Sequence, residues 1–204
     1  GVTPNKFASE SFIDDIARLK GLDPLEFRMK LLHKNPLAQH VLRTVAEMAD
    51  WGKKSGVGVS FIESSGTLLG TIAEVSVDQK TGLVSVLNVW ATIDAGIAIQ
   101  PNNIIGQLQG AIVYGIGNAL KERITFHNGA VEQSNFHDYQ AMRMSETPDI
   151  ECHIVDSSRS PSGCAEIGSM GIVPAVANAI AAIIGRSVRH MPMTPERVLK
   201  AIRA

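Results

Sequence analysis

The sequence lacks the features that mark several large classes of protein. Its 204 residues include two cysteines, Cys152 and Cys164, which form no CxxC pair and have no histidine at the spacing of metal ligands. Aromatic residues make up 5% of the chain and the net charge is −1, so neither a base-stacking platform nor a basic surface is expected. We therefore expect two free thiols, no metal held by protein side chains and no nucleic-acid partner.

Long hydrophobic runs are also missing. The most apolar stretch, residues 172–184, contains Pro174 and Asn178 and is shorter than the roughly 20 residues of a membrane-spanning helix. The first eleven residues have neither a charged n-region nor an apolar h-region. We expect no membrane span in this stretch and no targeting signal at the start of this sequence.

Hydrophobic residues make up 45% of the chain, which is enough for one sizeable core or two small ones. The spacing of apolar residues changes from helical to a period of two just after Gly52, so helices are expected first and strands next. The expected helices lie at residues 7–19, 24–34 and 37–51, and the expected strands at residues 56–64, 70–78 and 83–94.

The rest of the chain alternates between helices and strands, and the whole order indicates an α+β fold: helices followed by a mixed or antiparallel sheet with helices packed on it. We expect two parts, a helical segment at residues 1–52 and an α+β domain at residues 53–204. The later elements are a helix at 104–122, a hairpin turning at Asn128-Gly129, a strand at 149–156, a helix after Pro174 and a helix at 194–202.

Glu166 stands alone among small and apolar residues, in the stretch SGCAEIGSMG. The nearest basic residues in sequence are Arg159 and Arg186, so no close neighbour neutralises its charge. A carboxylate in a dry, apolar site holds a proton more readily and can act as a general base near neutral pH. The alternative is an exposed loop glutamate, or one that pairs with an arginine across the fold, and the residues alone favour this alternative.

The helix expected at residues 104–122 contains four glycines, each about 1 kcal/mol less favourable than alanine in a helix interior. Such a composition indicates that something approaches the backbone closely. Gln107 and Gln109 add amide groups near the N-terminal end, which could hydrogen-bond an oxo group or a pterin edge. Tight packing against a strand is the alternative, and the glycine spacing alone favours it. The glycines are Gly106, Gly110, Gly115 and Gly117.

A polar cluster follows the expected hairpin. His137 and Asp138 are neighbours in sequence and would point to opposite sides of a strand, so no proton relay between them is expected. We expect the cluster to make structural hydrogen bonds. Its members are Asn135, His137, Asp138, Tyr139 and Arg143.

Two long segments form an ordered set of motifs that is highly specific as a whole. Residues 94–155 include DAGIAIQPNNIIGQLQGAIVYGIGNAL, and residues 162–192 begin SGCAEIGSMGIVPAVANAI. Together with residues 5–32 and 56–77, they strongly resemble the large, molybdenum-binding subunit of the xanthine oxidase family. Within that family, the chain is most similar to the isoquinoline 1-oxidoreductase β subunit and the large subunit of bacterial aldehyde dehydrogenases.

The resemblance implies roles for individual residues. Glu166 matches the glutamate of a Gly-Glu-Pro motif that acts as catalytic base, and Gln107 matches a glutamine that contacts the molybdopterin cytosine dinucleotide cofactor. Gly106 and Gly110 match glycines that let the helix approach this cofactor. The implied reaction is hydroxylation of an N-heterocycle or an aldehyde, with water as the oxygen source and Glu166 as general base.

The resemblance also implies partners. Electrons are expected to leave through iron–sulfur clusters of a separate small [2Fe-2S] subunit. Further cofactor-binding loops are expected in an N-terminal remainder of the large subunit, so the chain is interpreted as a carboxy-terminal portion that is inactive alone. Both the periplasm and the cytoplasm of a bacterium are open as locations.

Two positions depart from the family's pattern of Gly-Gly-Val-Gly-Glu-Pro-Gly. Ala165 stands in place of a glycine, and Ile167 stands in place of a proline that stiffens the loop. Glu166 is therefore expected to be held less rigidly, or the chain is a diverged member with altered activity. The other interpretation is a non-catalytic scaffold or interaction domain, in which the glycines serve packing and Glu166 is inert.

Overall fold

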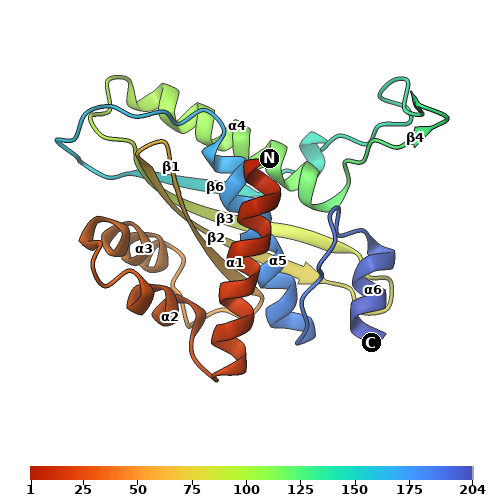
Figure 1. Cartoon of the computed structure of the whole chain (residues 1–204), viewed down its shortest axis with the longest axis horizontal. Helices are drawn as coiled ribbons and strands as arrows, with labels where there is room; N and C mark the ends of the chain where they lie inside the picture. Colours follow the sequence, from red (N-terminus) through yellow and green to blue (C-terminus); the bar gives the residue numbers. More distant parts are fainter. Residues whose placement is uncertain (204) are drawn as a thin grey trace.

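The computed structural model describes residues 1–203 and shows a four-stranded sheet with helices packed on both faces (Figure 1). The strand order is β1-β2-β3-β6; β2 is antiparallel to β1 and β3, whereas β6 is parallel to β3. The sheet is mixed, which confirms the α+β fold class. The sheet strands are β1 (Val57–Ser64), β2 (Thr67–Val77), β3 (Val84–Asp94) and β6 (Asp149–Ile154).

The helices follow the predicted order, and their capping residues explain several of their starts. Asp23 accepts hydrogen bonds from the backbone N–H groups of Leu25 and Glu26, both at 2.9 Å, and Pro24 occupies the first helical position. The helices are α1 (Val2–Leu19), α2 (Pro24–Leu31), α3 (Pro36–Met48), α4 (Pro101–Leu120), α5 (Ile167–Ile184) and α6 (Pro195–Arg203), with a short 3₁₀ helix η1 (Met144–Glu146).

One face of the sheet is covered by α3. Gly70 of β2 lies so close to this helix that a Cβ atom there would come within 2.9 Å of Val45 Cγ1. The buried cluster on this side joins the apolar stripe of α3 to β1, β2 and β3. The division of the chain at residue 52 stays a prediction. The cluster includes Val41, Leu42, Val45, Ile72 and Trp90.

The opposite face of the sheet is covered by α5, with α4 packed beside it. A Cβ atom on Gly58 of β1 would come within 2.3 Å of the Ala175 carbonyl oxygen, so only glycine permits this approach. Ser60 of β1 donates its hydroxyl to the Gly171 carbonyl of α5 at 2.7 Å. These two positions of β1 therefore face a buried helix and not solvent.

The α1 helix is confirmed, but the face that it buries is not the apolar one. Phe12 and Leu19 are 60% and 87% exposed, whereas Glu10 and Asp14 are 6% and 3% exposed. Arg28 of α2 lies between the two acids: its Nε atom donates to Glu10 Oε2 at 3.0 Å, and its Nη1 atom donates to Asp14 Oδ1 at 2.7 Å. An ionic cluster therefore joins α1 to α2.

The α5 helix begins at Ile167, so the prediction of a helix that starts after Pro174 is wrong. A proline inside a helix removes a backbone hydrogen bond and costs about 3 kcal/mol. Every residue from Ile167 to Ala181 except Ser169 is buried, and this burial outweighs the loss. By length and composition α5 could cross a membrane, but 78% of its 18 residues are buried within the protein, as in a core helix.

The segment between α4 and β6 forms an arm that projects from the body (Figure 1). Its two short strands, β4 (Phe126–His127) and β5 (Ala130–Val131), pair as the hairpin that the Asn128-Gly129 turn predicts. Asn128 and Gly129 both have positive φ, at 49° and 81°. Phe126 and Phe136 on the arm are each 69% exposed.

Candidate functional site

A shallow hollow of about 210 Å³ lies where α4 passes the N-terminal end of α5. It brings together Gln107 and Gly110 of α4 with Glu166, the residue that precedes the first turn of α5. Gly106 lies one turn before Gly110 and does not line the hollow itself. Three of the four predicted site residues therefore share one surface depression.

The Gln107 side chain connects the two segments. Its Nε2 atom donates to the Ala165 carbonyl oxygen at 2.5 Å, across 58 residues of sequence. Gln109, in contrast, points to the other side of α4, where its Nε2 atom donates to the Ile150 carbonyl of β6 at 3.3 Å. Of the two amides that stand out in the sequence, only Gln107 belongs to the site.

Three of the four glycines of α4 fall into two groups. A Cβ atom on Gly115 would come within 2.3 Å of Ile172 Cγ2 and 2.8 Å of Ser169 Cα, so this glycine permits close packing of α4 against α5. Gly106 and Gly110 have no heavy atom within 4 Å of the Cβ position. Helix packing therefore explains Gly115, whereas the open backbone at Gly106 and Gly110 is free for a group outside residues 1–203 to approach.

Glu166 is the N-cap residue of α5, and its side chain is exposed. Its carboxylate makes no capping hydrogen bond, and Arg159 pairs with Asp94 instead of Glu166, with Nη2 at 2.9 Å from Asp94 Oδ1. The expected dry environment is not formed by the described part of the chain, because one side of the hollow is open. The partial positive charge at the α5 N-terminus is the favourable electrostatic feature near this carboxylate.

The polar cluster near the arm has structural partners. Asp138 accepts hydrogen bonds from the backbone N–H groups of Asn135 and Ser134, which lower its pKa to about 2. Tyr139 donates its hydroxyl to Glu122 Oε2 at 2.7 Å, which raises the pKa of Tyr139 to about 12. His137 Nε2 lies 3.6 Å from Asp138 Oδ2. The two side chains do not point apart as expected, because residues 134–140 form a turn and not a strand.

The two cysteines are free thiols, and burial raises the pKa of Cys152 to about 11. Within residues 1–203, no group of three or more His, Cys, Asp or Glu side chains is arranged to hold a metal ion.

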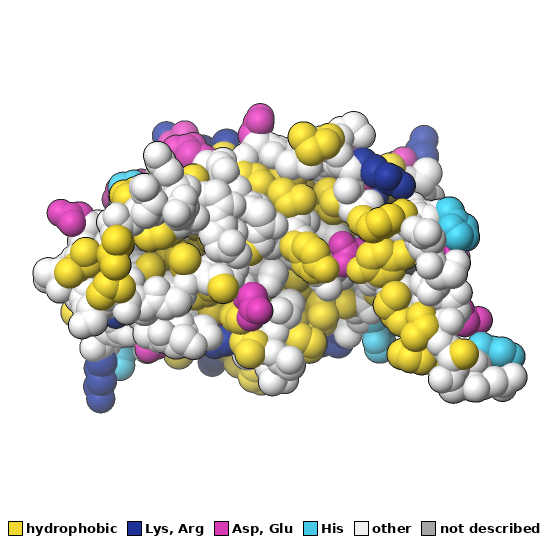
Figure 2. Space-filling view, turned by 90° about the horizontal axis from the view of Figure 1, so that it is seen from above, with side chains coloured by type: hydrophobic (Ala, Val, Ile, Leu, Met, Phe, Trp, Pro, Cys, Tyr) yellow, Lys and Arg dark blue, Asp and Glu magenta, His cyan; other side chains and the backbone are white. Residues whose placement is uncertain are grey.

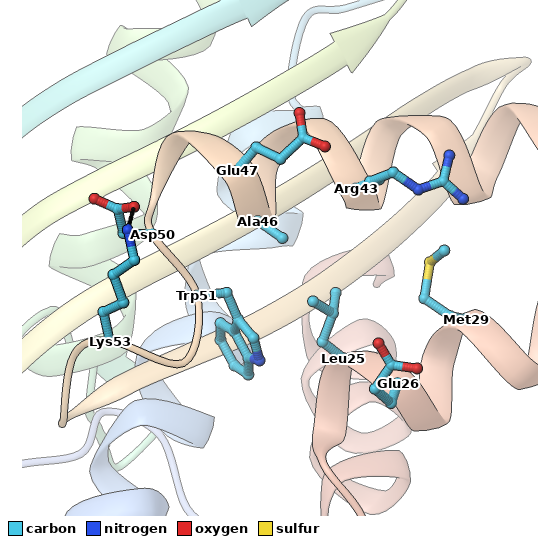
Figure 3. Close-up of a pocket in the computed structure, with 9 residues that line it drawn as sticks. All are labelled: Leu25, Glu26, Met29, Arg43, Ala46, Glu47, Asp50, Trp51 and Lys53. Atoms are coloured by element: carbon cyan, nitrogen blue, oxygen red, sulfur yellow. Dashed lines mark hydrogen bonds and ion pairs between the residues drawn. The ribbon is translucent and has the colours of Figure 1, made fainter.

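A larger hollow of about 410 Å³ lies between α2 and α3 (Figure 3). Leu25 and Ala46 form apolar parts of its wall, and the charged side chains belong to exposed residues of both signs. The Trp51 indole N–H donates to Asp23 Oδ2 at 3.0 Å, and Lys53 pairs with Asp50 at 2.6 Å. None of the predicted site residues lines this hollow.

Sequence reasoning missed two polar residues of the candidate site. Tyr114 and Ser169 also line the hollow, and Tyr114 is 65% exposed. A signal for Tyr114 was present, because Gln107, Gly110 and Tyr114 follow the spacing of one helix face. Ser169 gave no comparable signal, since the start of α5 was placed after Pro174.

A comparison with models of protein families shows to which family this chain belongs. The family model described as molybdopterin cofactor-binding domain matches residues 34–148, which is more than half of the chain. The chain belongs to this family. The match includes Gly106, Gln107 and Gly110 but ends before Glu166.

Curated relatives agree with the resemblance to the xanthine oxidase family. The chain is 38% identical over 202 residues to the β subunit of isoquinoline 1-oxidoreductase from Brevundimonas diminuta, a match that covers 96% of this chain and 26% of the relative. It is 31% identical over 221 residues to a nicotinate dehydrogenase polypeptide of Pseudomonas putida, covering 98% of this chain and 18% of that protein. The chain thus spans about a quarter or less of the length of these two relatives.

Solved structures show the same fold. Quinoline 2-oxidoreductase from Pseudomonas putida 86 matches 67% of this chain and 19% of its own with a TM-score of 0.63 and 25% identity. Aldehyde oxidoreductase from Desulfovibrio gigas matches 68% of this chain and 16% of its own with a TM-score of 0.60 and 26% identity. The predicted membership of the xanthine oxidase family is confirmed.

Proposed function

We propose that this chain forms one wall of the cofactor site in a molybdopterin-dependent oxidoreductase that hydroxylates an N-heterocycle or an aldehyde, with Glu166 as general base. The observation that carries this proposal is the shared hollow of Gln107, Gly110 and Glu166. The names of the relatives that match isoquinoline and nicotinate enzymes support the heterocycle class. A relative named as an aldehyde dehydrogenase, at 29% identity, supports the aldehyde class.

The residues in and beside the hollow suit a molybdopterin group. Gly106 and Gly110 leave the α4 backbone open where a side chain would otherwise stand. Gln107 uses its Nε2 atom on Ala165, and its Oε1 atom stays available to accept a hydrogen bond. We assign these three residues to cofactor binding, and we infer the cytosine dinucleotide form from the resemblance of the sequence.

The bound cofactor supplies the molybdenum centre that accepts electrons from the substrate. The protein residues supply positioning and proton transfer. Glu166 accepts the proton that water must lose when its oxygen is added to the substrate, because its carboxylate has no competing cationic partner in the described chain. Closure of the open side of the hollow would exclude water and strengthen the interactions of this carboxylate.

An additional part of the enzyme must provide that closure. Figure 2 looks onto this side of the molecule and shows hydrophobic side chains spread over it and along the arm. Ile99, in the loop before α4, and Tyr114 of α4 are 81% and 65% exposed, and exposed apolar side chains that gather on one face can mark an interface. We infer that an N-terminal remainder of the large subunit covers this face, and that a small [2Fe-2S] subunit receives the electrons.

The decisive experiment is Glu166→Gln in the complete holoenzyme. A general base contributes roughly 10²- to 10⁴-fold, so kcat for isoquinoline, nicotinate or a simple aldehyde is expected to fall by that factor with cofactor content unchanged. Glu47→Gln is the matched control, because Glu47 is an exposed glutamate of α3 outside the site.

Unchanged turnover of the Glu166→Gln enzyme would favour a non-catalytic scaffold role for this chain. No turnover in the unsubstituted holoenzyme would instead favour a diverged, inactive member of the family. The proposal also expects the 204-residue chain alone to have no activity. Stoichiometric cofactor binding and turnover by that chain alone would contradict the proposal that the chain forms only one wall of the cofactor site.

A further inference from the structure

The loop at residues 155–166, which we name the Glu166 loop, joins β6 to α5 and carries the proposed base. Within residues 1–203 the Glu166 carboxylate makes no hydrogen bond or ion pair, so its position depends on the backbone of this loop. Ile167 has more backbone freedom than the proline that the family pattern places there. Other contacts must therefore hold the loop.

The side chain of Arg159 is the most extensive of these contacts. Its Nη2 atom lies 2.9 Å from Asp94 Oδ1 and donates to the Asp94 carbonyl at 3.1 Å, and its Nε atom lies 3.3 Å from Asp94 Oδ2. Its Nη1 atom donates to the Gly66 carbonyl at 2.9 Å. One guanidinium group thus joins the Glu166 loop to the end of β3 and to the turn between β1 and β2.

Asp94 is suited to this task because it is 1% exposed and both of its carboxylate oxygens contact Arg159. Burial alone would raise the pKa of Asp94, but hydrogen bonds from Arg159 and from the Gly96 N–H outweigh burial and hold the pKa below its usual value. The carboxylate is therefore charged at neutral pH. A bidentate pair with a buried carboxylate and a half-buried guanidinium restricts geometry more than a fully exposed pair does.

Backbone contacts continue the attachment along the loop. The Ile97 N–H donates to the Arg159 carbonyl at 2.9 Å, and the Ser162 N–H donates to the Ala95 carbonyl at 2.8 Å. A Cβ atom on Gly96 would come within 2.2 Å of the Ser160 carbonyl, so the chain after β3 and the loop are in direct contact. Gln107 completes the series at Ala165, directly before Glu166.

From these contacts we propose that Arg159, held by Asp94, is a positioning residue that sets the location of Glu166 through the backbone of the Glu166 loop. The inference rests on the proposed function of Glu166 as general base. A displacement of about 1 Å in a reacting group can reduce turnover roughly 100-fold. The loss of Arg159 should therefore reduce kcat and leave KM for the substrate nearly unchanged.

The test uses the complete holoenzyme with Arg159→Met, Glu166→Gln and the double variant, assayed with isoquinoline or nicotinate, whichever the unsubstituted enzyme oxidises faster. We expect Arg159→Met to lower kcat by about 10- to 100-fold with KM within about twofold. In the Glu166→Gln background, Arg159→Met should cause no further loss, because a positioning residue has no effect once its target is removed. Arg186→Met removes the same charge from an exposed residue beyond the far end of α5 and should leave kcat unchanged.

A second measurement does not depend on activity. In the 204-residue chain, Arg159→Met should increase amide hydrogen exchange at Ile97 and Ser162, whereas Arg186→Met should not. If Arg159→Met does not yield folded holoenzyme, Arg159→Lys replaces it, since lysine keeps the charge but cannot form the same fork of contacts.

The outcomes separate the two proposals. A large effect of Glu166→Gln with no effect of Arg159→Met or Arg159→Lys would overturn the positioning role alone. Additive losses in the double variant would also overturn it, because Arg159 would then act independently of Glu166. No effect of Glu166→Gln would instead overturn the proposed base.

Discussion

Two sets of carboxylates in this protein have opposite surroundings. Glu10 and Asp14 of α1 are buried and share Arg28, and Glu10 Oε2, which accepts from Arg28, also accepts a hydrogen bond from the Phe61 N–H of β1 at 2.9 Å. Glu166 is exposed, and the structure gives its carboxylate no partner in residues 1–203. The first set connects three elements of the fold, whereas the Glu166 carboxylate connects none within residues 1–203.

This difference separates carboxylates that stabilise a fold from one that is free to react. A buried acid is tolerated when hydrogen bonds and an opposite charge satisfy its oxygens, and it is then unavailable for proton transfer. An acid with unsatisfied oxygens at the end of a firmly attached loop can bind and release a proton. The lone charge that stands out in the sequence is therefore not the one that the chain buries.

Arg28→Met should have the largest effect on stability. It leaves Glu10 and Asp14 buried without their cation, which typically costs about 3–5 kcal/mol. Glu166→Gln, in contrast, should change stability by less than about 0.5 kcal/mol, since it removes no contact. Urea unfolding of the 204-residue chain measures the free energy of unfolding of both variants. Equal losses of stability would mean that the buried carboxylates and Glu166 do not differ in their contribution to the fold.

The same contrast applies to the glycines of α4. Gly115→Ala should destabilise the chain by about 1–3 kcal/mol, because the added Cβ atom would overlap Ile172 and Ser169 of α5. Gly110→Ala should stabilise the isolated chain by up to about 1 kcal/mol, because the Cβ position is open and alanine favours a helix.

Cofactor content of the complete enzyme gives the matching readout for Gly110. If Gly110 admits the cofactor, the alanine variant should lose bound molybdopterin while its thermal stability is maintained. Full cofactor content in that variant would show that the open backbone at Gly110 is not used for binding.

The sequence was sufficient to predict the α+β class and the order of the main elements. The structure brings Gln107, Gly110 and Glu166 to one hollow, and the roles that the resemblance implies for them stay predictions. Alternation, caps and turn residues are local signals, and they identified β1, α2 and the β4–β5 hairpin at nearly their observed positions. The buried face of α1 could not be predicted this way, because Glu10 and Asp14 are buried only in company with Arg28, which lies in another helix.

The start of α5 was predicted wrongly for a related reason. Local propensity favours proline only in the first turn of a helix, so it predicts a start near Pro174. The burial of α5 against β1, β2 and α4 is a tertiary effect, and it keeps the residues before Pro174 helical. The contacts of Arg159 could not be predicted either, because the sequence shows only that Arg159 is the nearest basic residue before Glu166. Its actual partner, Asp94, lies 65 residues away.

The smallest expected effect is a pair of opposite pH dependences at Asp14 and Asp94. Burial raises the pKa of Asp14 despite the attraction of Arg28, so the unfolded chain ionises first as pH rises. Wild-type stability relative to Asp14→Asn should therefore decrease as pH rises above about 4. At Asp94 the hydrogen bonds from Arg159 and Gly96 outweigh burial and lower the pKa, so its contribution is complete above about pH 4 and is lost as pH falls further. Urea unfolding from pH 3 to pH 7 gives the free energy of unfolding of wild type, Asp14→Asn and Asp94→Asn. The value for wild type minus that for Asp14→Asn should fall with rising pH, and the value for wild type minus that for Asp94→Asn should rise. Equal slopes would mean that Arg28 satisfies Asp14 as fully as Arg159 satisfies Asp94, and that burial alone does not distinguish the two acids.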